Sequence, residues 1–172
     1  MADDAHIFLV TGIPGAGKTT VSRLLAERFE RGVHIEADAL QALIVRGALW
    51  PNEEPPDEAH RQLALRARNA AMLAANFFDH GFMVVIDDVI VGMNRLSIYE
   101  RLLSGRPLTL VVLAPPLDVV LARDATRGYK HTRGVWAHLD DEQRTKLRDV
   151  GIWIDTAEMT PDETVAAILV SA

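Results

Sequence analysis

The chain has 172 residues, of which 49% are hydrophobic and 24% charged, the composition of an ordinary globular domain. It contains no cysteine, which excludes disulfides and thiolate-bound zinc or iron–sulfur sites. A formal net charge of −6 disfavours a nucleic-acid partner, and no apolar run approaches the roughly 18 residues of a membrane-spanning helix. The first residues are acidic, unlike those of a signal peptide. We therefore expect a cytoplasmic protein with no membrane partner and a single domain over 1–172.

Five short apolar runs predict buried β-strands, and segments of helical periodicity separate them. In chain order the predicted strands are 6–11, 32–36, 82–86, 108–113 and 151–155. The predicted helices begin at 19, 39, 57, 95, 115, 140 and 160. Asp57 is expected to cap the third helix, and Thr160-Pro161-Asp162-Glu163 has the spacing of a capping box. The alternation predicts parallel strands joined by right-handed helical crossovers in a three-layer α/β domain, with ligands at the carboxyl ends of the strands.

The segment after the first strand predicts a phosphate-binding loop. Residues 12–19 read Gly-Ile-Pro-Gly-Ala-Gly-Lys-Thr and match G-x-x-x-x-G-K-[ST], the P-loop or Walker A motif, without a mismatch. Glycines let backbone N–H groups turn toward phosphates at the positive end of the following helix. Lys18 is expected to bridge the β- and γ-phosphates, and the Thr19 hydroxyl to reach Mg²⁺. The predicted nucleotide contacts are Gly12, Pro14, Gly15, Ala16, Gly17, Lys18, Thr19 and Thr20.

Acidic residues follow the second and third predicted strands. Asp87 and Asp88 end an apolar run, where an acid commonly holds the Mg²⁺ shell; we predict Asp87 for the metal and keep Asp88 for the substrate. Asp38 lies at the same sheet edge and is expected to accept the proton of the attacking hydroxyl. The alternative for Asp38 is to cap the helix that starts at 39.

A cationic segment predicts a lid over approximately 123–138. Arg123, Arg127, Lys130 and Arg133 lie within eleven residues, and mobile guanidinium groups can stabilise the charge of a transferring phosphoryl group. We expect Arg127 to contact the phosphate, and the alternative is a solvated charged surface.

Other basic residues receive plainer interpretations. The arginines at 61, 66 and 68 are interpreted as an exposed basic face of the long helix. The six histidines do not fall at zinc-ligand spacing, so we assign them no metal-binding role.

Together the motifs resemble the small P-loop kinases. They are the P-loop, the Asp38 segment, 85–89 followed by Gly92, the arginine-rich lid and the closing 154–156. The chain is most similar to the chloramphenicol phosphotransferase-like group, and more distantly to gluconate kinase and shikimate kinase. The resemblance implies a five-stranded parallel sheet, ATP or GTP as donor, Asp38 as base and Arg127 as the lid arginine. It also implies that adenine lies near Arg123 and Thr156.

The chain departs from the chloramphenicol enzymes in two places. Its 13–15 segment, Ile-Pro-Gly, is more similar to polynucleotide 5′-kinases, and its 53–56 insert has no obvious counterpart. We therefore expect an ATP- and Mg²⁺-dependent kinase for a small hydroxylated molecule such as a sugar acid, an antibiotic or a metabolite. A nucleotide or polynucleotide 5′-kinase and a non-catalytic ATP-binding switch are the alternatives. A compact acceptor under a short flap excludes water more easily than a polymer does, so no nucleic-acid partner is expected.

Overall fold

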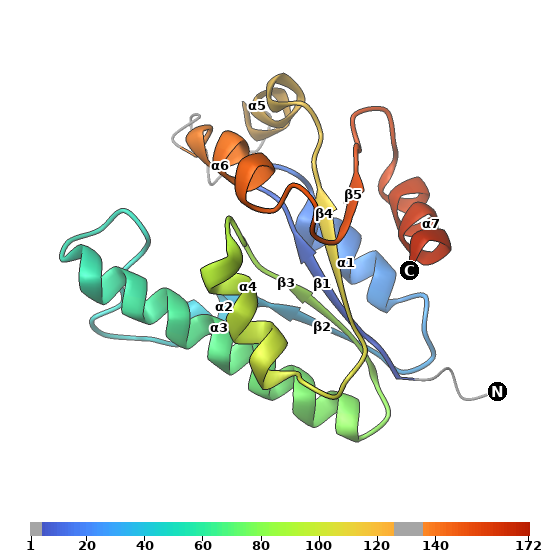
Figure 1. Ribbon diagram of the computed structural model, residues 1–172, viewed down its shortest axis with the longest axis horizontal. Coiled ribbons are helices and arrows are strands. Elements are labelled where there is room, and N and C mark those ends of the chain that lie inside the picture. The colour runs from blue at the N-terminus through green and yellow to red at the C-terminus, as the bar shows by residue number, and fades with distance from the viewer. Residues whose placement is uncertain (1–4, 126–135) are drawn as a thin grey trace.

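The predicted strands form one parallel sheet with helices on both faces (Figure 1). The computed structural model describes residues 5–125 and 136–172. The strands are β1 (Ile7–Thr11), β2 (Gly32–Glu36), β3 (Met83–Asp87), β4 (Leu108–Leu113) and β5 (Ile152–Ile154), in the order β2-β3-β1-β4-β5. The helices are α1 (Lys18–Ala26), α2 (Ala37–Gln41), α3 (Pro56–Asp79), α4 (Met93–Leu102), α5 (Leu117–Ala125), α6 (His138–Lys146) and α7 (Pro161–Ser171). The prediction of a five-stranded parallel α/β sheet is confirmed.

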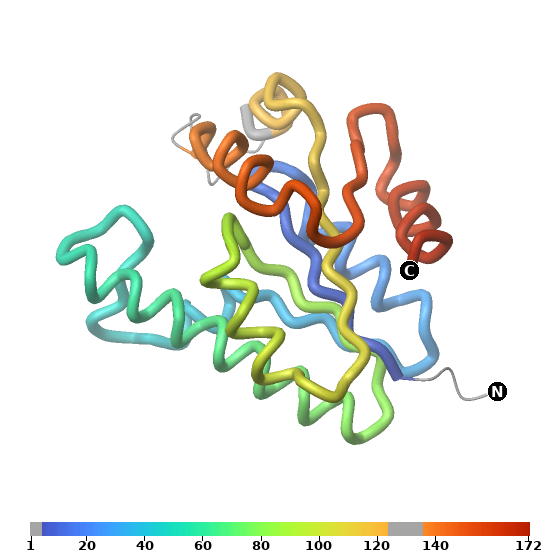
Figure 2. The backbone as a smooth tube through the Cα atoms, viewed as in Figure 1, coloured from blue at the N-terminus to red at the C-terminus, as the bar shows by residue number. Residues whose placement is uncertain are grey.

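Side-chain alternation along the central strand β1 divides the core into two layers. Ile7 and Leu9 pack in a cluster with residues of α3 and α4, whereas Phe8 and Val10 pack in a second cluster with residues of α1 and α7. Successive strand residues point to opposite faces, so a strand that is buried on both faces is apolar throughout. The path of the chain shows α3 and α4 on one side of the sheet and α1 and α7 on the other (Figure 2).

The registers of the ladders bring the predicted functional segments to one edge. Val10 of β1 and Glu36 of β2 both pair with Asp87, the last residue of β3. Thr11, the last residue of β1, pairs with Val112 near the end of β4. The P-loop, the start of α2 and the turn after β3 therefore leave the sheet at its carboxyl edge, where ligands bind in such folds.

Each helix start differs from its prediction by one or two residues, and two of these differences concern residues that the sequence analysis singled out. Helix α2 begins at Ala37, two residues early, because the chain turns directly from the extended Glu36 into the helix. Helix α3 begins at Pro56 with Pro55 as its N-cap, so Asp57 lies in the first turn and is not the cap. A carboxylate in the first turn still interacts favourably with the helix dipole.

The predicted capping box at the start of α7 is confirmed. The Glu163 backbone N–H donates to Thr160 Oγ1 at 3.2 Å, and the Thr160 backbone N–H donates to Glu163 Oε2 at 2.8 Å. These two bonds satisfy groups that the first turn of a helix leaves unpaired. Among the helices in the described part of the chain, none is long and apolar enough to cross a membrane.

Candidate active site

The P-loop connects β1 to α1 in a conformation that requires glycine. A Cβ placed on Gly12 would lie 2.6 Å from the Leu113 carbonyl oxygen, so β1 and β4 meet too closely there for any other residue. Gly17 caps α1 with φ of +94°, in the left-handed region that other residues avoid, and a Cβ there would enter open space. The requirement at Gly17 is therefore set by the backbone turn and not by crowding.

The loop folds back on itself and presents the start of α1. The Ala16 N–H donates to the Ile13 carbonyl at 3.1 Å, and Lys18 Nζ lies 3.4 Å from the same oxygen. Thr19 and Thr20 are exposed in the first turn of α1. A helix N-terminus with free N–H groups, an adjacent ammonium and accessible hydroxyls is suited to polyphosphate and its metal.

The side chains of the adjacent residues Asp87 and Asp88 lie on opposite faces of the sheet. Met83 and Val85 belong to the core layer of α1 and α7, so by alternation Asp87 points toward the α1 layer, which also carries Thr19. Its Oδ2 lies 3.1 Å from His34 Nε2 on β2, and its side chain is 6% exposed. Asp88 follows on the opposite face, where its side chain is fully buried. The expectation that Asp88 contacts substrate therefore does not fit the structure.

Asp38 lies in the first turn of α2, and its side chain is 43% exposed. The N-cap of α2 is Glu36, and no side chain makes a capping hydrogen bond there, so the capping alternative for Asp38 is wrong. Asp38 Oδ1 instead accepts a hydrogen bond from Arg66 Nη1 at 2.8 Å. Asp38 thus has one oxygen held by the protein and a side chain that reaches solvent at the carboxyl edge of the sheet.

Arg66 is the main functional candidate that sequence reasoning missed. It was expected on an exposed basic face, but its side chain is 4% exposed and its Nη2 donates to Asp88 Oδ1 at 2.5 Å. Arg61 and Arg68 are exposed as expected. A signal was present, because Arg66 is three residues after Leu63 and four before Ala70, on the apolar stripe of α3. A charge on a core-facing stripe needs a hydrogen-bonding or charged partner, and carboxylates are the partners that also neutralise it.

The carboxylate of Asp88 favours the charged form of Arg66 and the neutral form of Tyr99. Burial lowers the pKa of Arg66, but Asp88 and Asp38 outweigh that effect, and the net shift is upward, so the guanidinium stays charged. Burial and the Asp88 charge raise the pKa of Tyr99 well above its usual value, so its hydroxyl remains a donor; it lies 2.9 Å from Asp88 Oδ2. Burial lowers the pKa of Arg95, whose Nη1 donates to the Leu63 carbonyl at 2.8 Å.

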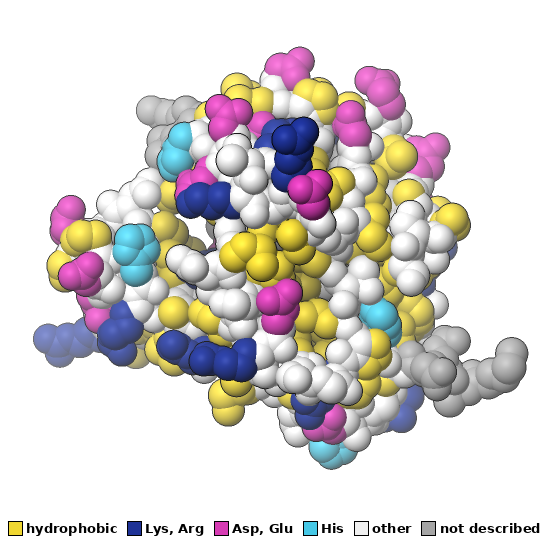
Figure 3. Space-filling model, in the orientation of Figure 1, with side chains coloured by type: hydrophobic (Ala, Val, Ile, Leu, Met, Phe, Trp, Pro, Cys, Tyr) yellow, Lys and Arg dark blue, Asp and Glu magenta, His cyan; other side chains and the backbone are white. Residues whose placement is uncertain are grey.

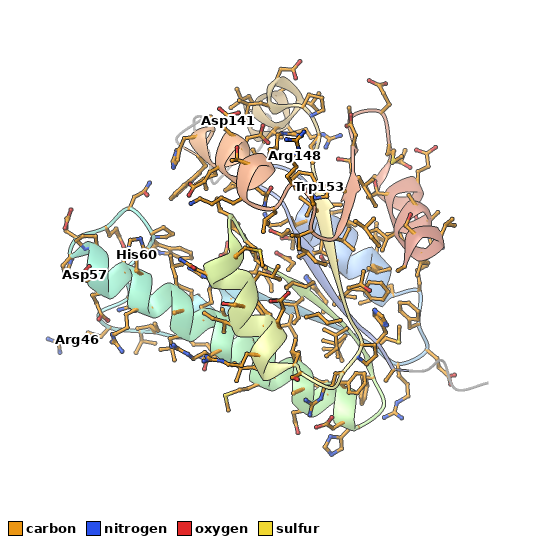
Figure 4. All side chains as sticks on the ribbon, viewed as in Figure 1. Arg46, Asp57, His60, Asp141, Arg148 and Trp153 are labelled. Carbon is orange, nitrogen blue, oxygen red and sulfur yellow. The ribbon has the colours of Figure 1, made fainter. Side chains whose placement is uncertain are left out.

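Helix α6 follows the predicted lid and is fixed to the P-loop edge. Buried Gln143 donates to the Ile90 carbonyl at 2.6 Å and to Thr11 Oγ1 at 3.3 Å. Arg144 pairs with Asp140 and donates to the carbonyls of two residues after β4. Side-chain views show His60 on the part of α3 that faces α6 (Figure 4), and the surface is hollowed between these two elements (Figure 3).

The lid cations fall partly outside the described residues. Arg127, Lys130 and Arg133 lie outside them, so the phosphate contact of Arg127 stays a prediction. Arg123 is described: its Nη2 donates to the Thr156 carbonyl at 2.7 Å and its Nη1 to Thr156 Oγ1 at 3.3 Å. The structure thus brings together the two residues that were expected near adenine. Their contact with adenine stays a prediction.

Comparison with known proteins places the chain in a family. A model described as an AAA domain (AAA_33) matches residues 7–149. An adenylyl-sulfate kinase of Myxococcus xanthus is 28% identical over 129 residues, which cover 72% of this chain and 65% of that protein. A UPF0200 protein of Aeropyrum pernix is 34% identical over 83 residues, which cover 47% of this chain and 44% of that protein. The chain thus matches less than two-thirds of the length of either relative.

Solved kinase structures share the fold at low sequence identity. A sugar kinase from Janibacter has a TM-score of 0.71 at 17% identity, covering 96% of this chain and 93% of that one. The APS kinase of Mycobacterium tuberculosis, solved with AMPPNP and APS, has a TM-score of 0.69 at 15% identity and covers 96% of both chains. Shikimate kinase of Acinetobacter baumannii, solved with shikimate, has a TM-score of 0.64 at 21% identity, covering 96% and 91%. The chain belongs to the AAA domain family and has the fold of the small P-loop kinases.

Proposed function

We propose that the protein is a Mg²⁺- and ATP-dependent phosphotransferase that moves the γ-phosphate to a hydroxyl of a small molecule. The observation that carries the proposal is the Asp38 carboxylate, which is half-exposed and held by a buried arginine at the sheet edge that also carries the P-loop. A switch that only binds nucleotide has no need for an oriented carboxylate beside the phosphate site. The kinase names of the similar proteins agree with this assignment.

The residues on the donor side fit a nucleoside triphosphate and its metal. Bound ATP·Mg²⁺ would supply the γ-phosphate and an electrophilic phosphorus. The N–H groups of the P-loop and Lys18 would hold the phosphates, while Arg123 and Thr156 would lie near the base. Thr19 and Asp87 would serve Mg²⁺, which commonly takes only one or two protein oxygens and completes its shell with phosphate and water.

The acceptor side needs a proton acceptor and a way to exclude water. Asp38 would orient the attacking hydroxyl and take its proton, a role for which a half-exposed carboxylate is accessible to a bound ligand. Excluding water would be the role of the predicted lid, whose residues 126–135 lie outside the described part of the chain. Gln143 of α6 bonds to Thr11 at the end of β1 and to Ile90.

A nucleotide acceptor is the second candidate. The observation that favours it is the adenylyl-sulfate kinase relative, which matches 72% of this chain. The Ile-Pro-Gly segment at 13–15, more similar to polynucleotide 5′-kinases, points in the same direction.

An acceptor screen tests these alternatives. ADP release from Mg²⁺ATP should be measured with sugar acids, aminocyclitols, phenylpropanoid antibiotics, shikimate, adenylyl sulfate and 5′-hydroxyl oligonucleotides. We expect at least a roughly tenfold stimulation by a small-molecule acceptor, abolished in Asp38→Asn. Stimulation by adenylyl sulfate alone would select the nucleotide acceptor, and stimulation by oligonucleotides alone would select end phosphorylation. Slow hydrolysis that no acceptor stimulates, and that Asp38→Asn leaves unchanged, would reject the transferase.

A further inference from the structure

A continuous chain of hydrogen bonds joins the interior of α4 to Asp38. The Tyr99 hydroxyl donates to Asp88 Oδ2 at 2.9 Å, and Arg66 Nη2 donates to Asp88 Oδ1 at 2.5 Å. Arg66 Nη1 then donates to Asp38 Oδ1 at 2.8 Å. Four residues from α4, the turn after β3, α3 and α2 are therefore connected in one line. Exposure increases along it, because Tyr99 and Asp88 are fully buried, Arg66 is 4% exposed and Asp38 is 43% exposed.

The buried end of this line is held rigidly. Asp88 Oδ1 also accepts the Val89 backbone N–H at 2.8 Å, so the Asp88 carboxylate has three donors. The guanidinium of Arg66 is planar, and fixing Nη2 on Asp88 also fixes the direction of Nη1. Charge-assisted bonds in a water-poor interior are strong and directional. The position of Asp38 Oδ1 is therefore set from inside the protein.

We propose that Tyr99, Asp88 and Arg66 are positioning residues that hold the Asp38 carboxylate in the orientation needed for phosphoryl transfer. This inference rests on the proposed function of Asp38 as the acceptor-side base. It also gives Asp88 a role that its burial allows, since a side chain with no exposed surface cannot contact an acceptor. Tyr99 and Arg66 act through Asp38 and need not touch the substrate.

The line is more than a means of holding the helices together. Buried ion pairs contribute little net stability, and apolar residues of similar volume often replace them without loss. Arg66 Nε is buried and has no hydrogen-bond partner among the described residues, so this arginine is not the most stable choice for the position. The line also ends on an accessible carboxylate and not on another core residue. A role in orienting the Asp38 carboxylate explains both the choice of a buried arginine and the accessible end of the line.

A double-mutant cycle between Arg66 and Asp38 tests the proposal. Lysine keeps the charge of Arg66 but cannot bridge two carboxylates with a planar fork. With the acceptor found in the screen, Arg66→Lys should lower kcat about 10- to 100-fold and leave the ATP KM within about twofold, the cost of a misplaced catalytic group. In an Asp38→Asn background, Arg66→Lys should lower kcat by less than about twofold, because the group that it positions is already lost. If the double variant instead loses kcat by the product of the two single-variant losses, the two residues act independently and the proposal is wrong.

Two further variants separate positioning from folding. Tyr99→Phe removes only the hydroxyl at the buried end and should lower kcat roughly three- to tenfold, again without effect in the Asp38→Asn background. Arg61→Lys is the matched control, since Arg61 lies on the same helix, is exposed and pairs only with Glu58 among the described residues. It should leave kcat unchanged. Equal losses of kcat in Arg61→Lys and Arg66→Lys would also contradict the proposal.

Crystal structures of the variants test the positioning role even when no acceptor is known. In the structure of Arg66→Lys, the Asp38 side chain should leave the rotamer that it has in the wild type, whereas in Arg61→Lys it should keep it. An unchanged Asp38 in Arg66→Lys would overturn the positioning role. If the screen finds no acceptor, the proposed function fails by itself, and this crystallographic comparison still decides whether Arg66 orients Asp38.

Discussion

The donor side and the acceptor side of the proposed site are built in different ways. The P-loop is one continuous stretch of chain, and its shape comes from backbone conformations such as that of Gly17. The acceptor side consists of side chains from α2, α3, α4 and the turn after β3, which meet through Arg66. A local backbone structure can be recognised in a sequence, whereas a meeting of distant side chains cannot. The difference teaches that the phosphate-binding loop can be inferred from a motif, whereas the side chains that hold Asp38 can be identified only from tertiary contacts.

The largest effect is expected on the donor side. Lys18→Ala should abolish measurable transfer, because Lys18 is the ammonium of the P-loop and is expected to neutralise charge between two phosphates. The measurement is ADP release at saturating ATP and acceptor, with circular dichroism to verify folding. More than a tenth of the wild-type kcat remaining would show that the motif does not serve transfer.

Asp38→Asn tests the acceptor side directly. The amide keeps the size of the side chain but is a far weaker proton acceptor, so kcat should fall by about 10²- to 10⁴-fold. The ATP affinity should stay nearly unchanged if the two sides are as separate as their construction indicates. Equilibrium binding of a non-hydrolysable ATP analogue measures it. An equal loss of ATP affinity would contradict the division between donor and acceptor sides.

Gln62→Ala asks whether the loop before α3 belongs to the acceptor side. Gln62 is buried, donates to the Gly47 carbonyl at 2.7 Å and accepts the Leu49 N–H at 2.8 Å, so it holds this loop against α3. Its loss should lower the free energy of unfolding by about 1–3 kcal/mol. If this loop lines the acceptor site, its displacement should weaken acceptor binding by about 1 kcal/mol, the contribution of one hydrogen bond. The acceptor KM should then rise roughly fivefold while the ATP KM is unchanged.

Asn69→Ala, an exposed position on the same helix, is the control for Gln62→Ala and should change neither quantity. A selective rise in the ATP KM of Gln62→Ala would place the loop on the donor side instead.

Thr160→Ala should have a small effect, and on stability alone. It removes the side-chain oxygen that caps α7 and should lower the free energy of unfolding by about 1 kcal/mol, measured by urea denaturation. Helix α7 packs against α1 and β5, and the Thr160 side chain bonds within the capping box, so kcat should be unchanged. A lower kcat at full folding would show that the α7 layer contributes to the donor side.

The smallest expected effect is on the free energy of unfolding at low pH. The backbone N–H and the hydroxyl of Thr160 lower the pKa of Glu163 below its ordinary value of 4.5. A group whose pKa is lower in the folded state stabilises it above the ordinary value, and that contribution is lost as pH falls through the folded value. The difference in unfolding free energy between wild type and Glu163→Gln should therefore shrink as the pH falls below 4.5. A difference that grows as the pH falls would contradict a lowered pKa of Glu163 in the folded state.

Much of the fold could be predicted because its signals are local. The five apolar runs, the P-loop and the Thr160 capping box each depend on residues that are neighbours in the chain. Helix starts were less accurate, and α2 and α3 both begin before the expected residue, because a carboxylate near a helix start favours the first turn as well as the cap.

By itself, the sequence determined the parallel α/β sheet, the P-loop and the placement of Asp38 at the carboxyl edge, since apolar periodicity and glycine patterns act over short distances. Only the tertiary structure decided that Asp38 is not a helix cap, that Asp87 and Asp88 face different layers, and that Arg66 lies inside. Arg66 and Asp88 are 22 residues apart in the chain, and Asp38 and Arg66 are 28 apart. Arg66 pairs with both carboxylates because a buried charge needs partners, and these partners come within reach only once α2, α3 and β3 are packed.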